Sequence, residues 1–166
     1  MIDTFGDNLL EGFQREETVM EEDKDAGLFR FFHEYVNVLE GIKTQTKNVH
    51  WASLKLPNRD KRGAHLYLDD FLEEVGDFQD LVAESAMGIT GVSFDFNTVH
   101  GTPFNATSTK EFMKYVQDKT KEFYNGIPDT TICAGIKSET ETFILKINQY
   151  VFRFMLTEWW LSGATW

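Results

Sequence analysis

Cysteine, proline and long apolar runs are all scarce in this chain of 166 residues. A single cysteine, Cys133, excludes an internal disulfide framework and a multi-cysteine zinc site, and it favours a reducing, cytoplasmic location. No stretch approaches the roughly 20 uncharged residues that a membrane-spanning helix needs, and the acidic N-terminus is unlike a secretory signal. We therefore expect a soluble, globular protein that has no membrane partner.

Basic residues are also few, because 16 Lys and Arg stand against 27 Asp and Glu and give a net charge of -11. Such a charge argues against DNA binding, which depends on basic surfaces. Residues 1–24 alone hold eight acidic side chains against Arg15 and Lys24. We expect this acidic segment to be a solvated, partly disordered tail, and residues 25–166 to form one folded domain.

The apolar residues recur at intervals of three and four along most of the chain, which is typical of helices that bury one face. A long connection with no clear period, over residues 92–107, separates the second predicted helix from the third. The expected fold class is all-α, a ferritin-like four-helix bundle with a long crossover between its second and third helices. The four helices are predicted at about 25–52, 62–87, 109–125 and 139–161.

Two capping-box patterns mark the beginnings of the last two predicted helices. They are Ser108 with Glu111 and Ser138 with Glu141. In this pattern each side chain accepts a hydrogen bond from a backbone N–H that is otherwise unpaired at a helix start.

The second predicted helix carries two pairs of candidate metal ligands, His65 with Asp69 and Asp80 with Glu84. All four lie on one stripe of the helix, but His65 and Asp80 are about 22 Å apart along its axis, so one ion cannot reach them all. An antiparallel pairing of this helix with its own copy would bring His65 level with Glu84 and Asp69 level with Asp80. Near the same two-fold axis lies Gly76, which lacks a Cβ and lets two backbones approach closely.

A further candidate ligand, His50, lies on the first predicted helix. If the chain turns near Pro57, the helical hairpin places His50 level with His65. Two imidazoles and up to three carboxylates suit iron, manganese or zinc, whereas magnesium and calcium prefer oxygen ligands alone. Redox-active iron matches this mixed set best.

Three short runs of this sequence resemble elements of the Dps proteins, the miniferritins of the ferritin-like superfamily. The family elements are His-Trp, His-x3-Asp and Asp-x2-Ala-Glu. The matching runs are 48–51 (NVHW), 64–69 (AHLYLD) and 80–84 (DLVAE).

This resemblance implies a four-helix subunit that assembles into a hollow shell of twelve, with ferroxidase sites at two-fold interfaces and iron oxide stored inside. It also implies how the site residues divide between the subunits. His50 and His65, with Asp69 near them, would come from one subunit, and Asp80 and Glu84 would come from its neighbour. Trp51 would be the aromatic side chain beside the iron that intercepts oxidising equivalents.

The sequence thus favours a Dps-like ferroxidase, an enzyme that oxidises Fe(II) with hydrogen peroxide or dioxygen and sequesters the iron. Zinc or manganese could substitute for iron. The alternative is a non-catalytic, ferritin-like structural or interaction protein whose interface site is vestigial or holds zinc. For Trp51, packing in the core and a redox role both remain open. DNA compaction, which usually depends on a basic tail, is disfavoured by the acidic one.

Overall fold

The computed structural model describes the backbone of residues 5–55, 58–104, 106 and 108–157, and the side chains of 24–55, 62–104, 106 and 108–157. The described residues form no strand, so the predicted all-α class is confirmed. Within them, no helix has both the length and the apolar character of a membrane span. The elements are four long helices, α1 (Phe5–Ala52), α2 (Asn58–Thr90), α3 (Thr109–Gly126) and α4 (Ala134–Met155), and three 3-10 turns, η1 (Ser53–Lys55), η2 (Phe96–Thr98) and η3 (Thr131–Cys133).

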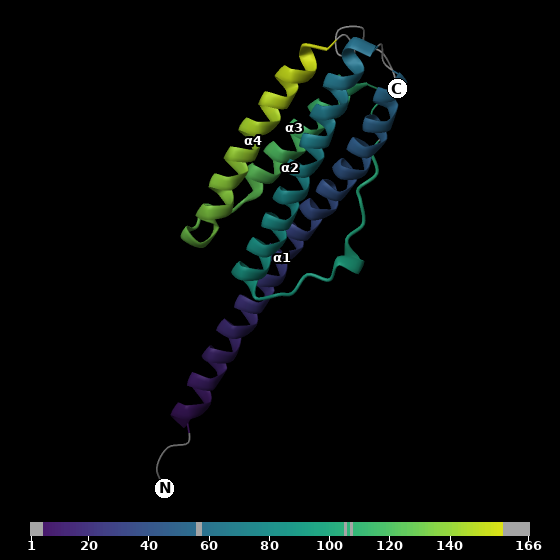
Figure 1. The fold of residues 1–166 in the computed structure, drawn as a ribbon. Coiled ribbons are helices and arrows are strands. Elements are labelled where there is room, and N and C mark those ends of the chain that lie inside the picture. Colours follow the sequence, from purple (N-terminus) through teal and green to yellow (C-terminus); the bar gives the residue numbers. More distant parts are fainter. Residues whose placement is uncertain (1–4, 56–57, 105, 107, 158–166) are drawn as a thin grey trace.

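The four helices pack as two antiparallel hairpins laid against each other (Figure 1). α1 packs mainly on α2, and α3 packs on α4. The two hairpins meet where α2 contacts α4 and α1 contacts α3. The N-terminal part of α1 extends beyond the other helices (Figure 1).

The first two helices are longer than the apolar periodicity predicts. α1 begins at Phe5 rather than near Asp25, so the backbone of most of the acidic segment is helical. Residues 5–24 contain no proline and several good helix formers, which allows the helix to continue beyond its buried part. The solvation of this segment stays a prediction, because side chains before Lys24 lie outside the described residues. α2 likewise extends beyond 62–87 at both ends.

Of the two predicted capping boxes, the one at Ser108 is confirmed for the serine side chain. Ser108 is the N-cap of α3, and its Oγ accepts a hydrogen bond from the Glu111 N–H at 3.3 Å. The prediction at Ser138 is wrong, since α4 begins at Ala134 and Ser138 lies inside it, where its carbonyl accepts from the Thr142 hydroxyl.

The physical reason for the earlier start of α4 is burial. Cys133 and Ile136 are both buried, and η3 leads directly into the helix, so packing sets the beginning of α4. The helix ends at Met155 with Leu156 as its C-cap, before the predicted end at 161. Residues 158–161 lie outside the described part of the chain.

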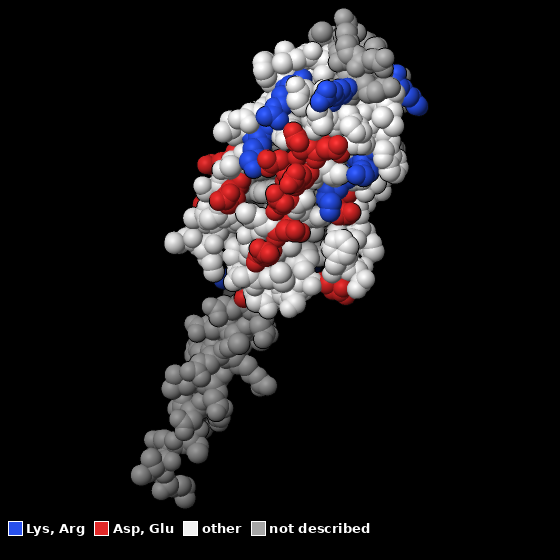
Figure 2. Space-filling view, in the orientation of Figure 1, with Lys and Arg blue, Asp and Glu red and all other residues white. Residues whose placement is uncertain are grey.

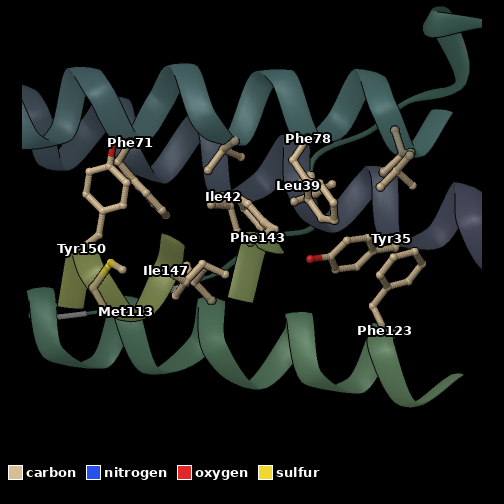
Figure 3. Packing of buried hydrophobic residues seen from close by; sticks show 14 of the residues in the cluster. Tyr35, Leu39, Ile42, Phe71, Phe78, Met113, Phe123, Phe143, Ile147 and Tyr150 are labelled. Atoms are coloured by element: carbon tan, nitrogen blue, oxygen red, sulfur yellow. The ribbon is translucent and has the colours of Figure 1, made fainter. Parts of the chain in front are cut away.

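Aromatic side chains fill much of the core between the two hairpins (Figure 3). Tyr35 of α1 stacks on Phe123 of α3 with ring centroids 3.9 Å apart, and Phe78 of α2 stacks on Phe143 of α4 at 4.0 Å. The Tyr35 hydroxyl donates to Thr120 Oγ1 at 3.0 Å, and burial raises the pKa of this phenol. The residues that recur at intervals of three and four along α1 and α2 are buried, with the exceptions of Leu28 and Leu72, which are half-buried. The buried ones are Phe32, Tyr35, Leu39, Ile42, Thr46 and Val49 of α1 and Leu68, Phe71, Val75, Phe78, Val82 and Ala86 of α2.

The connection between α2 and α3 lies against α1. Asn37 accepts two backbone hydrogen bonds from it, one from Thr102 at its carbonyl (2.9 Å) and one from His100 at its Oδ1 (2.8 Å). At Gly41 the two backbones are so close that a Cβ would overlap the Thr102 carbonyl oxygen. Only glycine fits at this point of α1.

Gly41→Ala should therefore destabilise the fold. We expect a loss of about 1–3 kcal/mol in the free energy of unfolding, because the added methyl group must displace backbone rather than a flexible side chain. Urea unfolding followed by circular dichroism measures this loss. Gly27→Ala, on the same helix, is the matched control, since its Cβ would meet nothing within 4 Å. Equal stability changes in the two variants would contradict the prediction.

Candidate metal centre

The α1–α2 hairpin brings three candidate ligands together at its closed end. The rings of His50 on α1 and His65 on α2 have centroids 3.9 Å apart, so the two imidazoles lie side by side, as the predicted turn near Pro57 requires. Asp69 lies one helical turn after His65 on the same face of α2. One potential ligand atom from each of the three residues lies within 4.8 Å of the others. Elsewhere in the side chains that the structure describes, no cluster of three or more His, Cys, Asp or Glu has this geometry.

The two imidazoles hold buried nitrogen atoms without hydrogen-bond partners. His50 is only 9% exposed, and its Nδ1 lies 2.9 Å from Asp69 Oδ1, yet the two atoms do not have hydrogen-bond geometry. Among the described residues, the buried Nδ1 of His65 also has no partner. Unpaired buried polar atoms are costly and therefore uncommon in folded proteins. Coordination of an ion is one way to satisfy His50 Nδ1, while His65 faces Asp69 with its Nε2, 3.8 Å from Oδ2.

The electrostatic surroundings of His50 favour its neutral form. Burial is the largest influence and lowers the pKa of His50; Asp69 opposes this shift, whereas His65 and Lys47 add to it. A neutral imidazole has a free lone pair, which is the state that binds a metal ion. Asp69 is half-exposed, so the cluster reaches the surface on the side of α2.

The other two predicted ligands lie apart from this cluster. Asp80 and Glu84 are exposed on α2 and do not belong to the group around His65. One chain therefore supplies three of the five predicted ligands in one place, and a contribution from a second copy stays a prediction.

Trp51 occupies the last turn of α1, directly after His50, and 61% of its surface is exposed. A role in the core of this chain, one of the two interpretations left open by the sequence, is therefore wrong. A redox role beside the metal stays a prediction.

Two residues near the hairpin were missed by sequence reasoning. Gln79 is buried, and its Nε2 donates to the Val36 carbonyl at 3.1 Å, while its Oε1 accepts from Lys43 Nζ at 2.9 Å. Val36 and Gln79 lie equally far along their two helices from the turn near Pro57, as His50 and His65 also do. The hydrogen bond between Gln79 and Val36 therefore stabilises the same register of α1 against α2 that aligns the imidazoles. A lone glutamine on the border of an apolar stripe is the only signal that the sequence offers.

The second missed residue is Glu74, which forms an ion pair with Lys146 of α4. The periodicity of α2 could not reveal this ion pair, because Lys146 belongs to a helix that is distant in sequence.

Comparisons of the chain with protein-family models, with curated proteins and with solved structures find no match. The functional interpretation therefore depends on the residues and their geometry.

Removal of either imidazole should weaken metal binding. His50→Ala and His65→Ala are each expected to lower the affinity for Co(II) at least about tenfold, or ~1.4 kcal/mol, because each removes a ligand. Calorimetric titration of metal-stripped protein measures the affinity, and the rise in melting temperature with added metal should shrink in parallel. His100→Ala, in the exposed connection, is the control and should bind as the unchanged chain does. Unaltered affinity in both site variants would exclude this cluster as the metal site.

Proposed function

We propose that this protein is a Dps-like ferroxidase that oxidises Fe(II) at a site shared between subunits and sequesters the product. The observation that carries the proposal is the cluster of His50, His65 and Asp69, in which two buried ring nitrogens have no hydrogen-bond partner. Such a pair of imidazoles with carboxylates nearby suits a redox-active transition metal better than magnesium or calcium.

The arrangement of the helices supports a ferritin-like bundle as the fold. Two antiparallel hairpins are joined by a connection that lies along α1, which agrees with a long crossover between α2 and α3. In bundles of this kind, metal sites are built from side chains on facing helices. The closed end of the α1–α2 hairpin provides such side chains.

We propose that Asp80 and Glu84 of a second copy complete the site. The pairing of α2 with its own copy brings Asp80 level with Asp69 and Glu84 level with His65, and it generates two equivalent sites in each pair. The wider assembly is a homo-oligomer, for which the resemblance to the Dps family implies a shell of twelve.

The site residues would act on Fe(II) as the substrate. His50 and His65 would bind the ion through nitrogen, and the carboxylates would compensate the additional positive charge that the ion acquires on oxidation. With hydrogen peroxide, two Fe(II) ions each lose one electron, the O–O bond breaks, and two protons are taken up to form two water molecules. Trp51, which follows His50 in α1 and is exposed, would donate an electron to stray oxidising equivalents.

Two histidines and one aspartate are also a ligand set that zinc accepts, so a structural zinc site is the second candidate. A zinc site would hold the two-fold interface together and would not turn over Fe(II). Oxidation of Fe(II) distinguishes the two functions.

A complementation experiment tests the shared site. One variant, His65→Ala with Asp69→Ala, keeps Asp80 and Glu84 for its neighbour's site but has only His50 left for its own. The other, Asp80→Ala with Glu84→Ala, keeps His50, His65 and Asp69 but contributes no ligand to its neighbour's site. Each alone should lose Fe(II) oxidation. Mixed in equal amounts after dissociation, they should recover about a quarter of the original rate, because half of the pairs are mixed and each mixed pair has one intact site of two.

The rate is measured by absorbance after peroxide is added to anaerobic protein with Fe(II). Asp70→Ala with Asp77→Ala removes two other carboxylates from α2 and serves as the charge-matched control, which should remain active. Full activity in either ligand variant alone, or no recovery on mixing, would contradict the shared site.

A further inference from the structure

From Gly63 to Thr90, the charged side chains of α2 are all acidic. Between Gly63 and Thr90 the sequence has seven Asp and Glu and neither Lys nor Arg. Figure 2 shows acidic side chains gathered in a band over the middle of this face, with basic side chains on both sides of the band. Apart from Glu74, which pairs with Lys146 of α4, the acidic residues of this stretch are exposed.

Pairing of two α2 helices through this face concentrates like charges. The four carboxylates on the same stripe of α2 as His65 and Gly76 would be doubled by those of the partner. Among the described residues, Glu73, Asp80 and Glu84 have no ion-pair partner within the chain. Exclusion of water from the interface strengthens their mutual repulsion. The four carboxylates are those of Asp69, Glu73, Asp80 and Glu84.

Gly76, in the middle of α2, would allow a second copy to approach this face closely. A Cβ at Gly76 would meet nothing within 4 Å, so no contact within the described chain explains the glycine. Alanine would form a better helix at this position. Close approach of a second backbone would account for the glycine, and Gly76 lies beside the axis that aligns the ligands.

A cation bound at the candidate site would offset the acidic charge of this face of α2. The same face carries the cluster in which His50 is nine-tenths buried and its Nδ1, 2.9 Å from Asp69 Oδ1, has no hydrogen-bond partner in the described part of the chain. A divalent cation at each cluster would be bound by His50 Nδ1, which lies 2.9 Å from Asp69 Oδ1, and by His65 Nε2, which lies 3.8 Å from Asp69 Oδ2. It would also supply the positive charge that the paired carboxylates lack.

We propose that binding of a divalent cation at His50, His65 and Asp69 drives the pairing of two copies through α2, and that the metal-free faces repel each other. The proposal rests on the shared site of the proposed function and adds regulation of assembly to it. By thermodynamic linkage, the factor by which pairing strengthens metal binding is also the factor by which metal strengthens pairing.

Sedimentation velocity of the full chain, first stripped of metal and then titrated with Zn(II), tests this proposal. Zn(II) is used because it cannot be oxidised under these conditions. We expect the association constant to rise at least about tenfold with metal. The rise should vanish in His50→Ala with His65→Ala. Association that is complete without metal, or that responds to Zn(II) equally in this variant, would overturn the proposal.

Asp80 and Glu84 are the ligands that each copy would contribute to its partner's site. Neutralising them should have two opposite effects on the association of two copies. Asp80→Asn with Glu84→Gln is expected to weaken the response to Zn(II) and, because repulsion falls, to increase association without metal. The control with the same charge change is Asp25→Asn with Glu34→Gln on α1, where Glu34 lines a groove facing α3. This control should behave as the unchanged chain does. Unchanged metal-free association in the α2 variant would refute the repulsion.

Blocking variants separate this proposal from the proposed catalysis. Gly76→Leu should abolish Zn(II)-driven pairing, whereas Gly88→Leu, at the other open glycine of α2, should not. Circular dichroism checks that both variants fold. If Zn(II) drives pairing but the paired protein does not oxidise Fe(II), the catalytic proposal fails and the assembly proposal stands. If Fe(II) is oxidised by protein whose association is independent of metal, the reverse holds.

Discussion

The packing of α1 on α2 is the constraint on which the candidate site depends. A slip of one helix past the other by one turn, about 5.4 Å, would separate the two imidazoles beyond the reach of a single ion. Apolar contacts along the hairpin resist such a slip, and the hydrogen bonds of buried Gln79 to α1 fix the same register from within. The ligand geometry is thus a product of core packing.

The site itself is stabilised less well than its surroundings. The aromatic stacks and the close contact at Gly41 hold the bundle together, whereas the imidazoles keep buried nitrogens without partners and lie beside exposed carboxylates. Local conflict of this kind is characteristic of functional sites, where binding of a ligand recovers the stability that the empty site lacks. The like charges on the acidic face of α2 are a second unfavourable feature, and they lie on the surface around the same site.

Much of the fold could be predicted from the sequence, because an amphipathic helix reveals its buried face by its period. The hairpin register followed from the position of Pro57, and it placed His50 beside His65 correctly. Helix ends were less predictable: Ser138 has a capping pattern yet lies inside α4, since burial of Ile136 outweighs it. Gln79 and Glu74 were missed because a side chain's partner on another helix is set by tertiary packing.

The hydrogen bond of Tyr35 influences where electrons can leave this protein. The phenol gives its hydrogen to the Thr120 hydroxyl, which in turn donates to the Val116 carbonyl, and neither acceptor is a base that could retain a proton. A tyrosine that loses an electron must also release its proton, so Tyr35 is a poor electron source. An oxidant in solution would therefore react with exposed Trp51 before it reacts with buried Tyr35.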